Sequence, residues 1–82
     1  MDIKVLGSGC HNCQALERET VNALAEMDIA ANVEKVTDFM KIAEYGVLAT
    51  PALVVNGRVK VSGRVPRRDE IKAWLTEEMK TP

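Results

Sequence analysis

The chain has 82 residues, of which 46% are hydrophobic, and its formal net charge is −1 at pH 7. This length suits one domain, which we expect over residues 1–82 as a monomer. The near-zero charge gives no indication of nucleic acid or a membrane as a partner, and no apolar run approaches the ~20 residues that cross a bilayer. The N-terminus lacks the features of a secretory signal, so we expect a cytoplasmic protein, although a mature form without its signal would look the same.

The first third of the chain predicts a strand followed by a long helix. Residues 3–6 form an apolar run interrupted by Lys4, which is typical of a strand covered on both faces. Residues 12–27 then carry apolar side chains at helical spacing, and Asn12 is a candidate cap for the helix start. The stripe consists of Cys13, Leu16, Thr20, Val21, Leu24 and Met27.

A second strand and a short helix are predicted next. Residues 31–36 alternate between apolar and polar side chains, which indicates a strand. Thr37 and Asp38 can cap a helix, and Gly46 provides its end, because glycine takes the left-handed cap conformation without penalty. The apolar face of this helix is expected to consist of Phe39, Ile42 and Ala43.

Residues 52–61 predict a β-hairpin. Its two apolar segments flank Asn56-Gly57, the strongest two-residue hairpin signal. The second segment carries Arg58 and Lys60 on one face, and charges on an edge strand discourage pairing with other chains, the interpretation we favour. The alternative is a functional basic patch, shared with Arg64, Arg67 and Arg68.

A third helix closes the chain. Pro66 fits its first turn, and Asp69 and Glu70 suit the positive end of the helix dipole. The element order is therefore β-α-β-α-β-β-α, an α/β fold with a four-stranded mixed sheet. We expect the first and third helices on one face, the second on the other, and the first strand at the centre. The apolar stripe of the third helix is expected to be Ile71, Trp74, Leu75 and Met79.

Both cysteines lie where the first strand turns into the first helix, in the sequence Gly-Ser-Gly-Cys-His-Asn-Cys of residues 7–13. The free N–H groups and the dipole at a helix start stabilise an anion, so a thiol there is stabilised as thiolate. The thiolate is the nucleophile of thiol–disulfide exchange. We expect Cys10 to attack and Cys13 to resolve, with protonated His11 lowering the pKa of Cys10 further.

Other chemistry fits the same residues. The cysteines also fit a structural disulfide, or copper or zinc ligands in a metal carrier, although zinc prefers four ligands. The Gly-x-Gly also fits a phosphate cradle, but Asn12 takes the place of the third glycine of the dinucleotide fingerprint. A non-catalytic adaptor would tolerate the loss of both cysteines.

The order of these motifs, with Thr50-Pro51 before the hairpin and Gly63 after it, resembles the small thioredoxin-like redox-active disulfide proteins. The resemblance implies a thioredoxin/glutaredoxin-like fold and an enzyme that reduces protein disulfides through Cys10 and Cys13. It implies an electron-donating disulfide reductase, flavin-type or ferredoxin-linked, as second partner, and no cofactor, because the disulfide is the redox centre. It also implies that Pro51 is cis and packs against the cysteines. The Thr50 backbone would pair with an extended substrate, with Gly63 bordering the groove.

The chain departs from the ordinary thioredoxin pattern in three places. Gly9 replaces the usual Trp before the first cysteine, and His-Asn replaces Gly-Pro between the two. Lys4 lies about where thioredoxins carry a buried carboxylate used in proton transfer. We expect Lys4 to lie at the surface end of its strand, with its stem packed and its ammonium in water.

Overall fold

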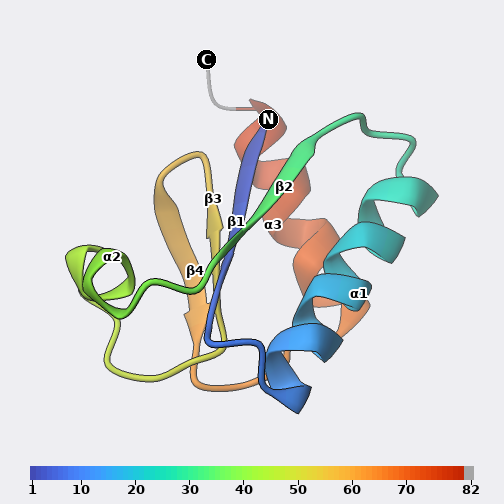
Figure 1. Cartoon of the computed structure of the whole chain (residues 1–82). Helices are drawn as coiled ribbons and strands as arrows, with labels where there is room; N and C mark the ends of the chain where they lie inside the picture. Colours follow the sequence, from blue (N-terminus) through green and yellow to red (C-terminus); the bar gives the residue numbers. More distant parts are fainter. Residues whose placement is uncertain (81–82) are drawn as a thin grey trace.

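The computed structural model describes residues 1–80, so the last two residues of the predicted domain 1–82 lie outside the described part. The element order is the predicted one, β-α-β-α-β-β-α (Figure 1). The elements are β1 (Asp2–Leu6), α1 (His11–Glu26), β2 (Asn32–Val36), α2 (Phe39–Glu44), β3 (Ala52–Val55), β4 (Arg58–Ser62) and α3 (Arg68–Lys80). Within residues 1–80, no helix has the length and apolar character needed to cross a membrane.

The sheet has the strand order β2-β1-β3-β4, so β1 is central, as predicted. β1 runs parallel to β2 and antiparallel to β3, and β3 runs antiparallel to β4. Ile3 of β1 is therefore flanked by Val33 and Val55. The sheet is the mixed sheet that the sequence predicts.

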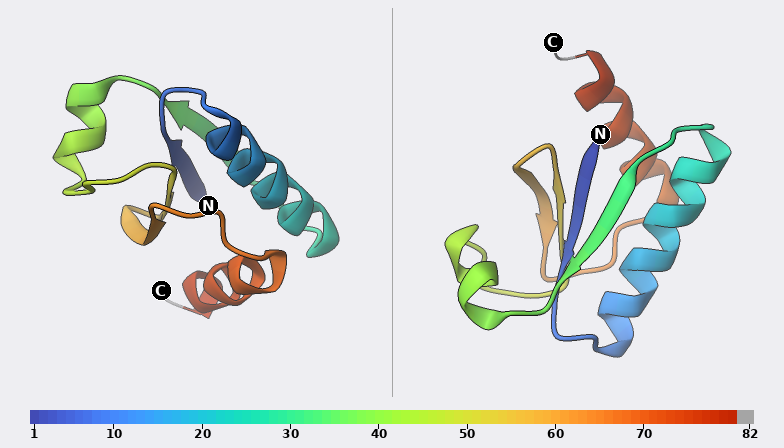
Figure 2. Two further views of the ribbon diagram at one scale, coloured as in Figure 1. Left: turned by 90° about the horizontal axis from the view of Figure 1, so that it is seen from below. Right: turned by 45° about the horizontal axis from the view of Figure 1, so that its top comes forward.

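Helices cover both faces of the sheet unequally (Figure 2). α1 and α3 cover one face and α2 the other, as predicted. The larger cluster of buried residues, between the sheet and the α1–α3 pair, contains Ile3, Val5, Leu16, Ala23, Leu24, Leu53, Val55, Val61, Ile71 and Leu75. The smaller cluster, under α2, contains Leu6, Val36, Ile42, Ala52 and Val54. The α1–α3 face therefore holds most of the core.

Local signals place the turns where the sequence predicts them. Asn56 and Gly57 both have positive φ, 51° and 81°, which is the geometry of a tight two-residue hairpin. The side chain of Asp38 accepts a hydrogen bond from the backbone N–H of Met40 and so caps α2. Gly46 follows α2 with a φ of 77°. The turn chemistry therefore sets both ends of the short helix and the hairpin pairing next to the turn, and a register shift follows between Leu53 and Val54.

Two predicted helix starts are wrong. α1 begins at His11 with Cys10 as its cap, so Asn12 lies inside the first turn. α3 begins at Arg68, and Pro66 lies before it. There the carboxylate of Glu70 accepts a hydrogen bond from the N–H of Arg67, which satisfies a free donor at the helix start.

The predicted apolar stripes of all three helices are partly wrong. In α1, Val21 is 47% exposed, and Ala23, which was not predicted, is buried. Phe39 is 81% exposed, and Ile42 is the buried residue of α2. In α3 the buried position near the end is Glu78 rather than Met79. Glu78 is buried because its carboxylate oxygen Oε2 lies 2.7 Å from the ammonium of Lys60 on β4.

The five basic side chains of the predicted patch are each paired with a carboxylate. Arg58 and Lys60 lie on β4, at the sheet edge, and both contact Glu78 of α3. Arg64 and Arg67 contact Glu70. Arg68 contacts Glu19 and Glu26 of α1, which ties α3 to α1. Arg58 and Lys60 thus lie on an edge strand, as the favoured interpretation requires, and the alternative of a functional basic patch stays an untested hypothesis.

Candidate active site

The two cysteines lie at the end of the molecule where β1 leaves the sheet (Figure 1). The chain turns through residues 7–10 and enters α1, so the site follows the C-terminal end of a central strand, where open α/β sheets place their sites. Gly9 has a φ of 85°, a conformation that favours glycine, at this turn. The turn brings Cys10 to the start of α1.

Cys10 caps α1 with its own side chain. Its backbone is extended (φ −68°, ψ 170°), and its Sγ accepts a hydrogen bond from the N–H of Cys13 at 3.4 Å. The N–H of Gln14 donates to the carbonyl oxygen of Cys10 at 3.0 Å. Cys10 is exposed, whereas Cys13 is buried, and neither forms a disulfide.

The pKa values of the two thiols shift in opposite directions. The pKa of Cys10 is lowered, first by a hydrogen bond with the Cys13 side chain and then by the backbone N–H of Cys13. The pKa of Cys13 is raised, first by burial and then by its hydrogen bond with Cys10. The arrangement therefore favours a thiolate at Cys10 and a protonated thiol at Cys13.

Gly7 makes room for the buried thiol. A Cβ at this position would lie 2.2 Å from the Sγ of Cys13, closer than any real contact. The N–H of Gly7 donates to the carbonyl of Val36 at 2.9 Å, so the β1–β2 ladder continues through the site. The same Cβ would lie 3.8 Å from the Cβ of Thr50, so Gly7 lies between Cys13 and Thr50. Our sequence analysis missed this role; a glycine directly after an apolar strand and six residues before a cysteine was its signal.

The other predicted site residues gather beside this loop. The Thr50–Pro51 peptide bond is cis, and Pro51 is fully buried while Thr50 is exposed. The N–H of Gly63 donates to the carbonyl of Pro51 at 2.8 Å. Gly63 has a φ of 84°, and a Cβ there would lie 3.2 Å from that of Ala49. The Thr50–Pro51 segment thus lies next to Gly63 on one side and, through Thr50, next to Gly7 of the cysteine loop on the other.

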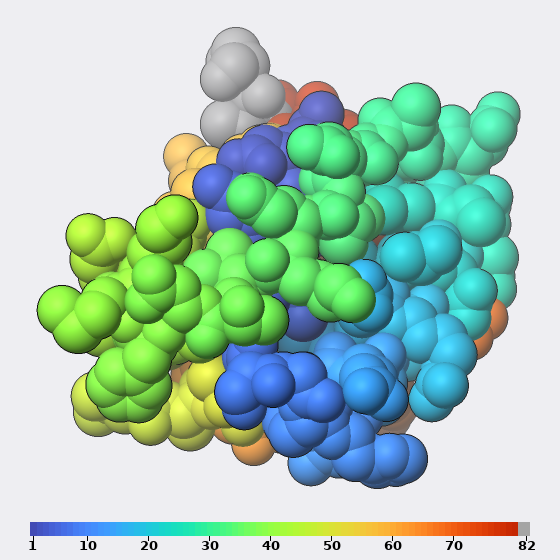
Figure 3. Space-filling model, in the orientation of Figure 1, coloured from blue at the N-terminus to red at the C-terminus, as the bar shows by residue number. Residues whose placement is uncertain are grey.

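An apolar groove of about 400 Å³ runs from this surface toward α2. Two of the apolar side chains that line it are exposed: Phe39 is 81% and Leu48 102% accessible. Ser8 and Thr50 line it on the side of the cysteine loop. The space-filling view shows that the loop (blue) and the segment after α2 (yellow-green to yellow) lie along the same lower end of the molecule (Figure 3).

His11 is the first residue of α1 and is exposed. The causes that lower the Cys10 pKa are hydrogen bonds from the side chain and backbone of Cys13 and from the backbone of Asn12 and Cys10. The imidazole is not among them. The predicted effect of protonated His11 on Cys10 therefore stays a prediction.

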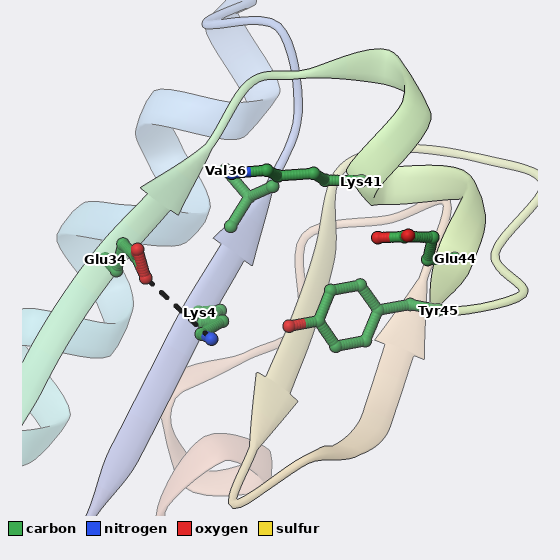
Figure 4. Close-up of a pocket in the computed structure, with 6 residues that line it drawn as sticks. All are labelled: Lys4, Glu34, Val36, Lys41, Glu44 and Tyr45. Atoms are coloured by element: carbon green, nitrogen blue, oxygen red, sulfur yellow. Dashed lines mark ion pairs between the residues drawn. The ribbon is translucent and has the colours of Figure 1, made fainter.

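Lys4 lies on the α2 face, away from the α1 face that carries Cys13. It lines a cavity of about 200 Å³ with Glu34 and Tyr45 (Figure 4). Its ammonium lies 3.8 Å from carboxylate oxygens of both Asp2 and Glu34, and its side chain is 27% exposed. Its pKa is raised, first by a hydrogen bond with Tyr45. The packed stem and partly exposed side chain of Lys4 agree with the expectation, and the structure adds two carboxylates and a phenol near the ammonium.

Metal binding would have few ligands here. Residues 1–80 contain no group of three or more His, Cys, Asp or Glu side chains that could hold a metal ion. The two thiols alone offer a two-ligand arrangement, which suits Cu(I) rather than the four-ligand preference of zinc. The two cysteines therefore offer fewer ligands than the four that zinc prefers.

Comparisons with known proteins agree with the site. Residues 1–76 match a family model described as a thioredoxin domain. The chain is 42% identical over 76 residues to a thioredoxin of Methanothermobacter thermautotrophicus, covering 93% of this chain and 99% of that protein. It is 34% identical over 73 residues to a thioredoxin of Methanocaldococcus jannaschii, covering 89% of this chain and 84% of that one. With the cysteine pair at the start of α1, these matches show that the chain belongs to the thioredoxin family and is a thiol–disulfide oxidoreductase.

Proposed function

We propose that Cys10 is the attacking nucleophile and Cys13 the resolving thiol in the reduction of protein disulfides. The observation that carries this assignment is the contrast between the thiols: Cys10 is exposed with a lowered pKa, and Cys13 is buried with a raised one. The thiolate is the reactive form, and only an exposed sulfur can meet a disulfide on another protein. Cys10 satisfies both conditions.

The reaction has two exchange steps. The Cys10 thiolate attacks one sulfur of the target disulfide, forms a mixed disulfide and releases the other sulfur as a thiolate that takes a proton from solvent. Cys13 loses its proton and attacks the Sγ of Cys10. A Cys10–Cys13 disulfide forms, and the second target sulfur leaves and is protonated. The target gains two electrons and two protons, and the enzyme is oxidised by the same two electrons.

The substrate segment binds along Thr50, Pro51 and Gly63. The exposure of Thr50 supports this, because the residue lies beside Gly7 and its backbone can pair with an extended peptide by strand addition. Beyond Thr50, the apolar groove lined by Phe39 and Leu48 accepts an apolar side chain near the target cysteine. We assign to His11 a secondary effect, in which its protonated form favours the Cys10 thiolate.

The oxidised enzyme must be recycled by an electron-donating disulfide reductase, because two electrons leave it in each turnover. Family membership supports such a partner, and the reaction itself needs no bound cofactor. We place the enzyme in the reducing cytoplasm as a monomer. There, thiol pairs of this kind act as catalysts rather than as structural bridges.

Covalent trapping in a cell lysate tests the two cysteine roles. Cys13→Ser should accumulate a mixed disulfide between Cys10 and its target, because nothing within the protein can resolve it. Cys10→Ser is the matched control and should trap little, since Cys13 is buried. The readout is a dithiothreitol-sensitive adduct on a non-reducing gel. Equal trapping by both variants, or by neither, would contradict the roles.

A further inference from the structure

Three neighbouring strands end in one row beside the cysteine loop. Leu6 of β1 pairs with Ala52 of β3, and Ala52 pairs with Ser62 of β4. The segments just beyond this row, which include Gly7 and Gly63, therefore leave the sheet at the same end. Figure 1 shows them together at the lower end of the molecule, blue before α1, yellow before β3 and orange after β4.

This row sets the distance between the cysteine loop and the segment after β4. Neighbouring strands lie about 4.8 Å apart, so two strand spacings separate Gly7 from Gly63 by about 10 Å. An extended peptide rises about 3.3 Å per residue. A substrate that presents its disulfide to Cys10 and pairs with Thr50 therefore reaches the segment after Gly63 within a few residues.

Two arginines lie in that segment. Arg64 follows Gly63 directly, and Arg67 lies just before α3. The N–H of Gly63 donates to the carbonyl of Pro51, so the backbone that carries Arg64 starts at the proposed substrate surface. The side chains of Arg64 and Arg67 are 55% and 80% exposed. Both guanidinium groups are therefore accessible to a bound protein.

The two arginines share one carboxylate, which leaves donors available. Arg64 donates to Glu70 through Nη1 and Nη2, at 3.2 and 2.9 Å. Arg67 approaches the same carboxylate only through Nε, at 3.7 Å, which is too long for a hydrogen bond. Within residues 1–80 the Arg67 guanidinium makes no hydrogen bond. Since a guanidinium carries five N–H donors, Arg67 keeps its full donor set for a partner.

We propose that Arg67, together with Arg64, binds an acidic side chain of the protein substrate, about two to four residues from the target cysteine. The planar guanidinium matches the two oxygens of a carboxylate, and such bonds are stronger than neutral ones. Glu70 shows that the segment accommodates a carboxylate, because it accepts from the Arg64 side chain and from the N–H of Arg67. An acidic substrate residue would meet the same kind of donors.

Two other exposed or half-exposed arginines do not share this position. Arg58 begins β4 beside the hairpin turn, at the opposite end of the strand from Gly63. Arg68 is held by Glu19 and Glu26 of α1. Of the basic side chains of the predicted patch, Arg64 and Arg67 are thus the pair beside the substrate surface.

The inference deepens the proposed function and rests on it, because it takes Cys10 as the nucleophile and the Thr50 segment as the substrate surface. The apolar groove lined by Leu48 lies on the α2 side of that segment, and the arginines lie on the Gly63 side. A preferred substrate therefore carries an apolar residue on one side of its target cysteine and an acidic residue on the other.

Peptide disulfides test this preference. Each peptide carries one cysteine joined to an uncharged thiopyridyl group, so attack by Cys10 on the peptide sulfur releases pyridinethione, whose absorbance is measured. Paired peptides have Glu or Gln two, three or four positions from the cysteine, on either side. Each rate is divided by that of free dithiothreitol with the same peptide. We expect Glu peptides to react about three- to fivefold faster than Gln peptides, on one side of the cysteine only, which is the size of an exposed ion pair.

Variants assign the preference to the two arginines. Arg67→Gln should remove most of it, and Arg67→Gln combined with Arg64→Gln should abolish it. Arg58→Gln is the matched control, since it removes an exposed arginine at the far end of β4, and it should keep the preference. The ratio of two peptide rates does not depend on the folded fraction, so a loss of stability from breaking the Arg64–Glu70 pair cannot imitate the expected result.

Four results would overturn the inference. They are equal rates for Glu and Gln peptides at every position, an equal preference on both sides of the cysteine, a preference that persists in the double variant, and a loss in Arg58→Gln as large as in Arg67→Gln. Failure of the proposed role of Cys10 would look different. In that case Cys10→Ser would release pyridinethione from every peptide as fast as the unmodified protein does.

Discussion

The two faces of the sheet differ in how completely helices cover them. On the α1–α3 face, ten buried residues pack together, and Arg68 joins the two helices through Glu19 and Glu26. On the α2 face, five buried residues lie under a helix of six residues, and Phe39 and Leu48 remain exposed beside a groove. One face supplies stability, and the other leaves apolar surface available for a partner.

The active site lies where these faces meet. Cys10 and Cys13 belong to α1, which the larger core anchors, whereas Thr50 follows the loosely covered segment after α2. A six-residue helix has little stability of its own, so α2 depends on Ile42 and on its caps. The cysteines therefore lie beside the larger cluster of buried residues, and the segment before Thr50 lies beside the smaller one.

The largest expected effect is a loss of stability from a substitution on the α1–α3 face. Leu75 of α3 is 0% exposed, so Leu75→Ala removes buried methyl groups and leaves a cavity, which costs about 2–5 kcal/mol of unfolding free energy. Ile42→Ala on the α2 face should cost less, because a cavity there can open to solvent. Urea unfolding of both variants measures the difference. Equal losses would contradict the proposed division between the faces.

The second largest effect is a loss of stability from filling the space between Gly7 and Cys13. Gly7→Ala places a Cβ 2.2 Å from the Sγ of Cys13, and forced overpacking of this kind costs about 1–3 kcal/mol. Urea unfolding gives the loss. In a Cys13→Ala background the clashing sulfur is gone, so the same substitution should cost less. A double-mutant cycle with no coupling would show that the thiol does not need the space that Gly7 leaves.

The sequence alone predicts the element order, the central position of β1 and the location of the cysteine pair at the start of the first helix. Those features follow from local signals, such as the Asn56-Gly57 turn and the apolar run before the cysteines. The contact between Gly7 and Cys13 was not predictable, because it depends on how β1 meets α1 in space. The pairing of Lys35 with Glu17 depends likewise on the β1–β2 register.

The exposure of Phe39 was mispredicted for a related reason. Helical spacing identifies an apolar stripe but not how much of it a short helix can bury. Ile42 alone reaches the sheet, and Phe39 is left beside the groove. At Glu78 the spacing failed because an ion pair with Lys60, supplied by another strand, makes a carboxylate acceptable in the core. The extent of the sheet under α2 and the position of Lys60 next to Glu78 both depend on other elements, so the sequence of one helix cannot predict them.

A smaller effect concerns the start of α3. Arg64 donates two hydrogen bonds to the Glu70 carboxylate, at 3.2 and 2.9 Å, and this lowers the Glu70 pKa to about 2, with the Arg67 N–H contributing next. Since the unfolded value is about 4.3, Glu70 stabilises the fold above that pH. The stabilisation is lost as pH falls from about 4.3 toward about 2. The unfolding free energy of Glu70→Gln should therefore lie below that of the unmodified protein at neutral pH and converge with it in acid.

Asp69→Asn is the matched control for that experiment, because it removes another carboxylate from the same first turn of α3. Any effect of the helix dipole is common to both variants. A Glu70→Gln deficit that persists unchanged in acid would show that the loss is not electrostatic. A deficit equal to that of Asp69→Asn would assign it to the dipole rather than to Arg64.

The smallest effect on stability is expected on the open face, where the consequence should be for substrate binding instead. Leu48 is fully exposed, so Leu48→Ala should change the unfolding free energy by less than about 0.5 kcal/mol.

Because Leu48 lines the groove beside Thr50, the same change removes apolar surface that a protein substrate would cover. Partial burial of one leucine on binding is worth roughly 1 kcal/mol, so kcat/KM for a protein disulfide should fall about fivefold. The first nitrothiophenolate released from the small disulfide dithiobis(nitrobenzoate), which requires only attack by Cys10, should appear at an unchanged rate. Met40→Ala is the control, since Met40 is 73% exposed but does not line the groove. Equal effects of Leu48→Ala and Met40→Ala on the protein substrate would show that the groove has no part in recognition.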